Sequence, residues 1–151
     1  MLQNMLNAIL ANFYERDIRK LIEEINLFEN EEDLWRTQGS IKNSAGNIVL
    51  HLIGGMNYLI GTQLAKTNYV RDRAKEFTTK NVRRNDLIGK LEELIQMITE
   101  TLNSFAQEQM EAEYPLIFDD EKRSNNYLLV QLLAHLNYHL GQVSYLRRSF
   151  E

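Results

Sequence analysis

The sequence contains no cysteine, a single proline (Pro115) and only three histidines among its 151 residues. Without cysteine, a disulfide scaffold, a Cys-ligated zinc site, an iron–sulfur cluster and a cysteine nucleophile are all excluded. Proline interrupts the interior of helices. A chain with a single proline can therefore form long helices without interruption.

An excess of basic residues is also missing, since the formal net charge is −4. Nucleic-acid-binding proteins usually show a basic balance, so we expect no nucleic-acid partner. No apolar run reaches the roughly 20 residues of a membrane span. The first twenty residues lack the basic segment and small-residue cleavage site of an export signal. We therefore expect a cytoplasmic protein without a membrane segment.

What the sequence does contain is an ordinary globular composition, with 44% apolar and 25% charged residues. A chain of this length normally forms one domain and is long enough to bury a sizeable core. We predict a single domain over residues 1–151.

Apolar side chains recur with helical spacing along nearly the whole chain, and no long segment shows the alternation of a strand. Four long helices are predicted. The first covers residues 2–28, and the second begins near Asn43 or Ser44, both suitable N-cap residues, and runs to about Thr67. The third follows Asn85 and reaches Phe105, and the fourth follows Ser124 and reaches Leu146. Pro115 falls between the last two helices. The predicted fold is an all-α four-helix bundle with long connections between the helices.

The second predicted helix is apolar over more of its circumference than its neighbours. Beside its main stripe, a second row of apolar residues comprises Val49, Ile53, Ile60 and Leu64. A helix that is apolar on most sides is buried on most sides. Because two-fold dimers are the commonest oligomers, we predict a homodimer with this helix at the interface. The alternative is that a long loop of the same chain covers the second row.

The three histidines occupy comparable positions on two helices. His135 and His139 are four residues apart, so they lie on one helix face, one turn above the other. Both border the apolar stripe of the last helix, and His51 borders the stripe of the second helix. All three are therefore expected at the boundary between core and solvent.

A single histidine at such an edge is usually a hydrogen-bonded packing residue, and for His51 alone that interpretation is favoured. Three histidines at equivalent edges instead favour a divalent-metal site formed by His51, His135 and His139. A di-iron site needs Glu-x-x-His twice, and a zincin needs His-Glu-x-x-His; neither pattern is present. Haem ligation stays open but would leave one histidine unused.

Three histidines with an open coordination position are typical of catalytic zinc. Nickel, iron and manganese also accept such ligands, and zinc or nickel is the ion we expect. Three neutral ligands leave the dipositive charge on the ion. It can therefore act as a strong Lewis acid toward bound water or a bound thiol.

Three segments carry a resemblance to a known family: "NSAGNIVLHLIGGMNYLIG" (residues 43–61), "RDRAKEF" (residues 71–77) and "HLNYHLGQVSYL" (residues 135–146). With the single histidine on the second helix and His-x-x-x-His-x-Gly-Gln on the last, the chain resembles the DinB/YfiT-like metal-binding four-helix bundles over nearly its whole length. The resemblance implies that fold, dimerisation, and metal ligands at His51, His135 and His139.

Members of that family with known activity are thiol-dependent transferases and isomerases that use low-molecular-weight thiols such as bacillithiol, mycothiol or glutathione. The resemblance thus implies a metal-dependent thiol S-transferase acting on small electrophiles, or a related hydrolase. The alternative is a non-catalytic, metal-stabilised bundle that binds a ligand or responds to stress. Four polar residues are candidates to orient the histidines or a substrate: Asn47, Tyr58, Gln131 and Gln142.

One segment reverses the acidic balance of the chain. Residues 70–84 contain six basic residues (Arg71, Arg73, Lys75, Lys80, Arg83 and Arg84) against two acidic ones (Asp72 and Glu76). Such charge runs are mostly solvated loops with local salt bridges. The functional alternative is a patch that recognises a carboxylate-bearing thiol or another anionic ligand.

Overall fold

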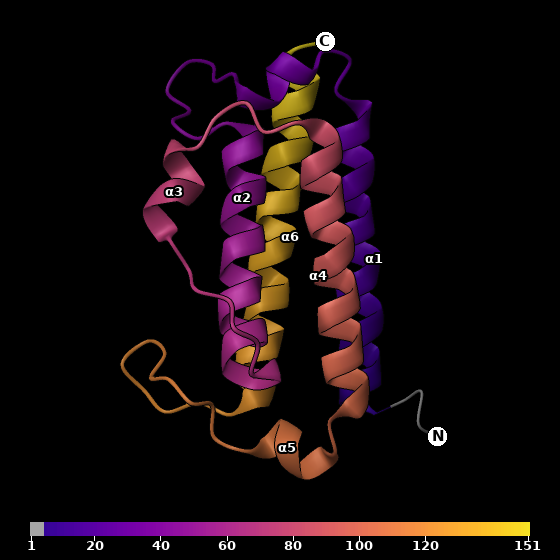
Figure 1. Cartoon of the computed structure of the whole chain (residues 1–151), viewed down its shortest axis with the longest axis vertical. Helices are drawn as coiled ribbons and strands as arrows, with labels where there is room; N and C mark the ends of the chain where they lie inside the picture. Colours follow the sequence, from indigo (N-terminus) through magenta and orange to yellow (C-terminus); the bar gives the residue numbers. More distant parts are fainter. Residues whose placement is uncertain (1–4) are drawn as a thin grey trace.

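The computed structural model describes residues 5–151, and this part of the chain is all-α, without a β-strand (Figure 1). Its four long helical stretches are α1 (Leu6–Leu27), α2 (Ala45–Met56) continued by the π-helix η3 (Asn57–Ala65), α4 (Arg84–Ser104) and α6 (Asn125–Ser149). The connections contain the short 3₁₀-helix η2 (Glu31–Trp35) and the short helices α3 (Arg73–Thr78) and α5 (Gln107–Glu111).

The long helices lie side by side along the long axis of the molecule (Figure 1). Helix α1 packs against α4 and α6, and α2 packs against the same two helices, so α1 and α2 are diagonal to each other. Helix α3 lies on the outer side of α2, and α5 lies at one end, between α4 and α6 (Figure 1). The contact between α2 and α6 is the one that positions the histidines.

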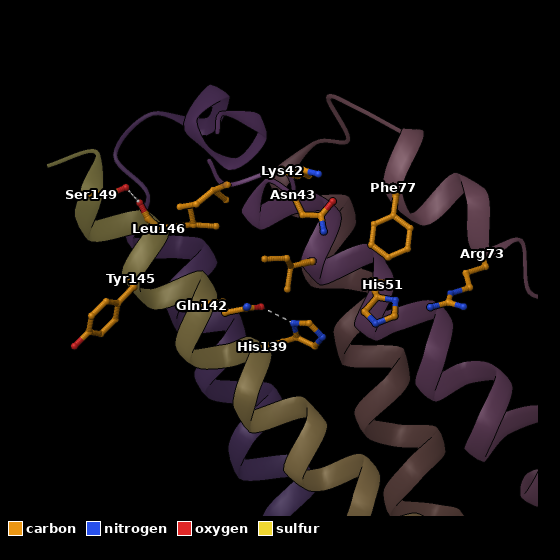
Figure 2. Close-up of a pocket in the computed structure, with 12 residues that line it drawn as sticks. Lys42, Asn43, His51, Arg73, Phe77, His139, Gln142, Tyr145, Leu146 and Ser149 are labelled. Atoms are coloured by element: carbon orange, nitrogen blue, oxygen red, sulfur yellow. Dashed lines mark hydrogen bonds between the residues drawn. The ribbon is translucent and has the colours of Figure 1, made fainter. Parts of the chain in front are cut away.

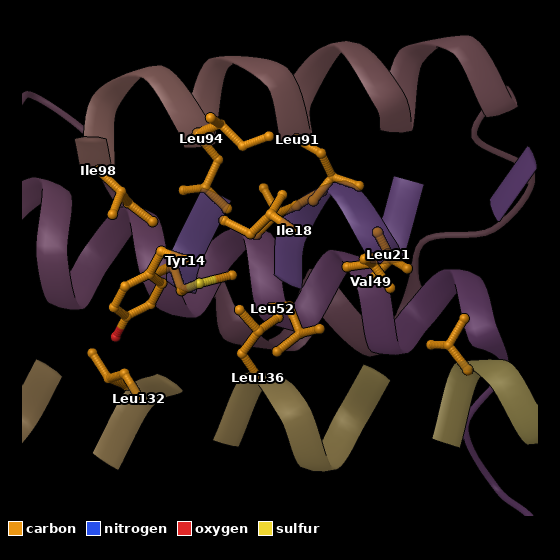
Figure 3. Close-up of a cluster of buried hydrophobic side chains, with 14 of the residues drawn as sticks. Tyr14, Ile18, Leu21, Val49, Leu52, Leu91, Leu94, Ile98, Leu132 and Leu136 are labelled. Carbon is orange, nitrogen blue, oxygen red and sulfur yellow. The ribbon is translucent and has the colours of Figure 1, made fainter. Parts of the chain in front are cut away.

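The core between these helices is formed by aliphatic side chains from all four of them (Figure 3). Ile18 from α1, Leu52 from α2, Leu91 from α4 and Leu136 from α6 are at most 2% exposed. Burial of each such side chain contributes on the order of 1.5–3 kcal/mol. The helical spacing of the apolar residues identified the core faces of α2, α4 and α6, but at the start of α1 it indicated Leu6 and Phe13, which are exposed, whereas Leu10 and Tyr14 are buried.

Two predicted helix starts are confirmed by their caps. The Ser44 side chain accepts a hydrogen bond from the backbone N–H of Asn47, and Ser124 accepts one from that of Tyr127, each at 3.2 Å. The predicted first helix begins at Leu2, which lies outside the described residues. The second stretch ends at Lys66, which adopts a left-handed conformation with φ 60° and closes the π-helix.

The second apolar row of α2 and η3 is covered within the chain, which removes the argument for a dimer through this helix. Val49 and Ile60 are fully buried, Ile53 is 6% exposed, and Leu64 packs half-buried against the core. The elements that contact α2 and η3 include α3, which lies in the connection after η3, and the bundle helix α4. The homodimer stays a prediction, now without support from this row.

The segment Ala45–Ala65 is long and apolar enough to cross a membrane by length and composition, which corrects the expectation that no segment would be. It also packs against α3, α4 and α6, and 44% of its most apolar window is buried inside the molecule. The same composition is expected for a helix at the centre of a protein core.

Candidate metal centre

The structure brings the three histidines together although His51 and His135 are 84 residues apart in the sequence. His51 comes from α2, and His135 and His139 come from successive turns of α6. The ring centroids are 4.4–5.4 Å apart, and one ring nitrogen of each lies within 4.8 Å of the others. Nε2 of His51 lies 3.2 Å from Nε2 of His135.

The far side of the His51 ring contacts a buried carboxylate. Nδ1 of His51 lies 3.0 Å from Oε1 of Glu76, a residue that is 5% exposed. Arg71 donates two hydrogen bonds to the same carboxylate, from Nε at 2.8 Å and from its terminal nitrogen at 2.9 Å. The paired donors of an arginine match the two oxygens of a carboxylate, which gives this contact strength and a defined geometry. Glu76 is thereby fixed beside His51.

Gly54 provides the space for that carboxylate. A Cβ atom at this position would come within 2.1 Å of Oε2 of Glu76. Gly54 lies on α2 and is buried, so Glu76 of α3 approaches the backbone of α2 directly. Only glycine permits this approach without displacing Glu76.

Helix α3 is held in register with α2 by a second buried polar residue. The side-chain amide of Asn47 donates hydrogen bonds to the backbone carbonyl oxygens of Glu76, at 2.9 Å, and Thr79, at 2.8 Å. Its oxygen accepts from the hydroxyl of Ser44 at 2.7 Å and from the ammonium group of Lys80. Asn47 therefore positions the segment that carries Glu76 and does not touch the histidines itself.

The hydrogen bonds of two histidines define which ring nitrogens remain available. His51 Nδ1 faces a carboxylate, and His139 Nδ1 lies 2.7 Å from Oε1 of Gln142. Both partners are acceptors, so each Nδ1 carries the hydrogen and each Nε2 keeps a free lone pair. Acceptor oxygens of this kind are the usual partners of metal-ligating histidines.

The surroundings keep two of the rings neutral at pH 7. Burial lowers the pKa of His51, against the opposing effect of Glu76. Burial, with the neighbouring His139, His51 and Arg71, lowers the pKa of His135 to about 4. A neutral imidazole is the form that binds a metal ion.

The donor set fits a divalent ion. Two nitrogens bound to one tetrahedral zinc at 2.0–2.1 Å are about 3.3 Å apart, and the His51–His135 nitrogen separation is 3.2 Å. All three ligand atoms lie within 4.8 Å of one another, so the most separated pair would have to approach more closely when all three bind one ion. His51, His135 and His139 are thus the residues that could hold it.

Two pockets adjoin the histidines on opposite sides. The larger, of about 660 Å³, is lined by His51 and His139 together with Phe77, whose ring centroid is 5.1 Å from that of His51 (Figure 2). The smaller, of about 310 Å³, is lined by His51, His135 and Gln131. A group bound at the histidines is therefore accessible from two cavities.

The four polar candidates from the sequence occupy different places. Gln142 contacts His139 directly, and Gln131 lines the smaller pocket one turn before His135. Asn47 is fully buried and holds α3. Tyr58 lies half-buried in the π-helix and makes no hydrogen bond to the histidines.

The sequence analysis did not identify Glu76 as a partner of His51, nor Arg71 and Gly54 as its support. Glu76 was counted only as a charge in a basic segment, and this segment forms α3 instead of a continuous loop. The available signal was the pair Arg71 and Glu76 within one charged motif. It could not be assigned to His51 because the contact depends on how α3 folds back onto α2.

Replacing Gly54 by alanine should expel the Glu76 carboxylate from its place beside His51, because the added Cβ would overlap Oε2. We expect the free energy of unfolding of the metal-free protein to fall by about 1–3 kcal/mol, the cost of disrupting a buried charged pair. Gly89→Ala is the matched control, since a Cβ there meets nothing within 4 Å in helix α4. It should stabilise by roughly 0.5–1 kcal/mol. Urea unfolding followed by circular dichroism measures both; equal effects would contradict this account of Gly54.

Of the comparisons with known proteins, the one with protein families gives a match, and it extends over nearly the whole chain. No curated protein and no solved structure matches it significantly. Residues 2–151 match the family described as "Protein of unknown function (DUF1572)". This match covers nearly the whole sequence, including all three histidines, Arg71 and Glu76. The chain therefore belongs to the DUF1572 family.

Proposed function

We propose that this protein is a DinB/YfiT-like four-helix bundle that binds a divalent metal ion through His51, His135 and His139 and transfers a small thiol to an electrophilic substrate. The observation that carries the proposal is the convergence of three ring nitrogens within 4.8 Å from two helices. Zinc and nickel are the ions that we favour.

The partners of the histidines support the metal part of the proposal. Only one hydrogen bond can form across the 3.2 Å contact between Nε2 of His51 and Nε2 of His135, whereas one ion can accept a lone pair from each of the three rings. The hydrogen bonds of Nδ1 to Glu76 and Gln142 have the form that orients metal ligands. These features favour ligation over simple packing.

The two pockets support a reaction of two substrates. His51 lines both cavities, His139 the larger and His135 the smaller. A thiol and an electrophile entering from opposite sides would meet at the histidines, with no need to share one cavity. Holding two reactants together in the correct geometry accelerates their reaction.

When bound, the ion supplies the Lewis acidity that lowers the pKa of a thiol, making the nucleophilic thiolate available at neutral pH. The chain supplies the rest. Glu76 holds His51 in the tautomer that presents Nε2, and Arg71 holds Glu76. Gln142 does the same for His139. Phe77 and the other apolar residues of the larger pocket offer a substrate an apolar surface beside the histidines.

Each single histidine-to-alanine variant should lose stoichiometric metal, because two imidazoles leave an incomplete ligand set. Glu76→Gln should retain the ion with about 10–100-fold weaker affinity, the effect expected for an outer partner of a ligand. Zinc titration of chelator-treated protein by calorimetry measures this. Gln96→Ala, at an exposed position of α4 away from both pockets, is the control and should bind as the wild type does. Unchanged affinity in any histidine variant would contradict the ligand assignment.

Metal binding should also resist acid more than a site of ordinary histidines. The pKa of His135 is lowered to about 4 and that of His51 is lowered too. At His135, protons therefore compete with the ion only as the pH falls toward about 4. Zinc affinity measured between pH 7 and pH 5 should weaken less than expected for three imidazoles of pKa about 6.5. A full three-proton loss of affinity over this interval would contradict the lowered values.

Cobalt substitution tests the thiol part separately. Addition of glutathione or cysteine to the cobalt-loaded protein should produce thiolate-to-metal charge-transfer absorption, because the ion has an open position for sulfur. His51→Ala treated in the same way is the control and should show no such band. If the wild-type spectrum does not change with several thiols, the non-catalytic, metal-stabilised binding bundle becomes the better description.

A further inference from the structure

The two pockets beside the histidines share an electrostatic property that the metal proposal does not use. No acidic residue lines either of them in the described part of the chain, whereas Arg71, Arg73 and Lys42 do. The protein as a whole carries a formal charge of −4. The charged residues that line the two pockets are therefore basic, although the molecule is acidic overall.

Three of the six basic side chains of the segment 70–84 make contacts that hold the fold. Arg71 is paired with Glu76, Lys80 donates to Asn47, and Arg84 donates to the backbone carbonyl oxygens of Asn26 and Phe28. For these residues the interpretation as local structural contacts is appropriate. They are not available to a ligand without loss of those contacts.

Arg73 differs from them. It is exposed, it forms no ion pair with any described residue, and it lines both pockets. Figure 2 shows its guanidinium group directed toward His51. Arg73 is the first residue of α3. Asp72 caps this helix, and the side chain of Asn47 holds it against α2. A free guanidinium group on a fixed backbone is thus held next to the histidines.

The larger pocket adds an apolar surface and a second cation. Ile48 and Leu146 are among its buried apolar lining residues, and the ring of Phe77 lies next to that of His51 (Figure 2). Lys42, also exposed and without an ion pair among the described residues, lines the same pocket. Its volume of about 660 Å³ is within the range of sites for drug-sized ligands.

We propose that the larger pocket binds an anionic amphiphile, a molecule with an apolar body and a carboxylate or phosphate group, and that Arg73 is the residue that selects the anion, with Lys42 as a second contact. This proposal rests on the proposed function, because it names the class of ligand that the same site would bind. The apolar body lies against Ile48, Phe77 and Leu146, and the anion faces the guanidinium group. Arginine suits this role because its planar donors bind both oxygens of such a group.

Phenylbutyrate and its uncharged amide are suitable probes because they share an apolar body and differ in charge. Their binding is measured by calorimetry at low ionic strength, with the full chain both chelator-treated and zinc-loaded. In the chelator-treated protein the carboxylate should bind about tenfold more tightly than the amide, the effect of one hydrogen bond to a charged group. Arg73→Gln should abolish this preference, and Lys42→Gln should reduce it.

Arg148→Gln is the matched control. Arg148 is an exposed arginine of α6 that lines neither of the two pockets, so the change in net charge is the same. This variant should keep the preference for the carboxylate. Equal binding of the two probes, a preference that survives in Arg73→Gln, one that is lost equally in Arg148→Gln, or no binding of either probe would each overturn the proposal.

The two protein forms separate this inference from the metal proposal. If the chelator-treated protein prefers the carboxylate through Arg73 but no form binds zinc, the anion site stands and the proposed function fails. If zinc binds through the three histidines but the chelator-treated protein shows no preference, the metal centre stands and the anion site is wrong.

Discussion

The contact on which the candidate site depends is the buried carboxylate of Glu76 between Arg71 and His51. A carboxylate removed from water is costly unless charged donors compensate it, and the paired bonds of Arg71 do so. The same oxygen that accepts from Arg71 also faces Nδ1 of His51. One short helix, α3, thus connects the charge of a surface segment to the orientation of a ring on α2. The close approach requires that residue 54 be glycine.

This arrangement explains why the sequence predicted the histidines well and their support poorly. Four-residue spacing and the edges of apolar stripes are local properties of a helix, so they placed His135 and His139 on one face and identified the Ser44 and Ser124 caps. The approach of Glu76 to Gly54 depends on the path of a connection with no apolar periodicity of its own. The same limit applies to α2, whose second apolar row suggested a partner chain but is covered by α3 and α4.

The positive charge available at the site depends on which basic residues of one segment are already bound to other groups of the protein. Arg71 is held by a carboxylate, Arg84 by backbone carbonyl oxygens, and Arg73 by neither. Sequence composition records these as one run of positive charge. The fold distinguishes them: Arg71 and Arg73 both line the smaller pocket, but Arg71 is paired with Glu76, whereas Arg73 has no ion pair among the described residues. Charge in such a segment therefore has to be assigned residue by residue before it can be linked to a ligand.

The separation of 84 residues between His51 and His135 has a further consequence for the folding of the chain. An ion shared by α2 and α6 would be a reversible cross-link that closes a loop of that length, and cross-links over long loops restrict the unfolded ensemble most. Occupancy and unfolding would then be thermodynamically linked. Depletion of the ion would lower the resistance of the whole molecule to proteolysis, so metal supply would set its lifetime as well as its chemistry.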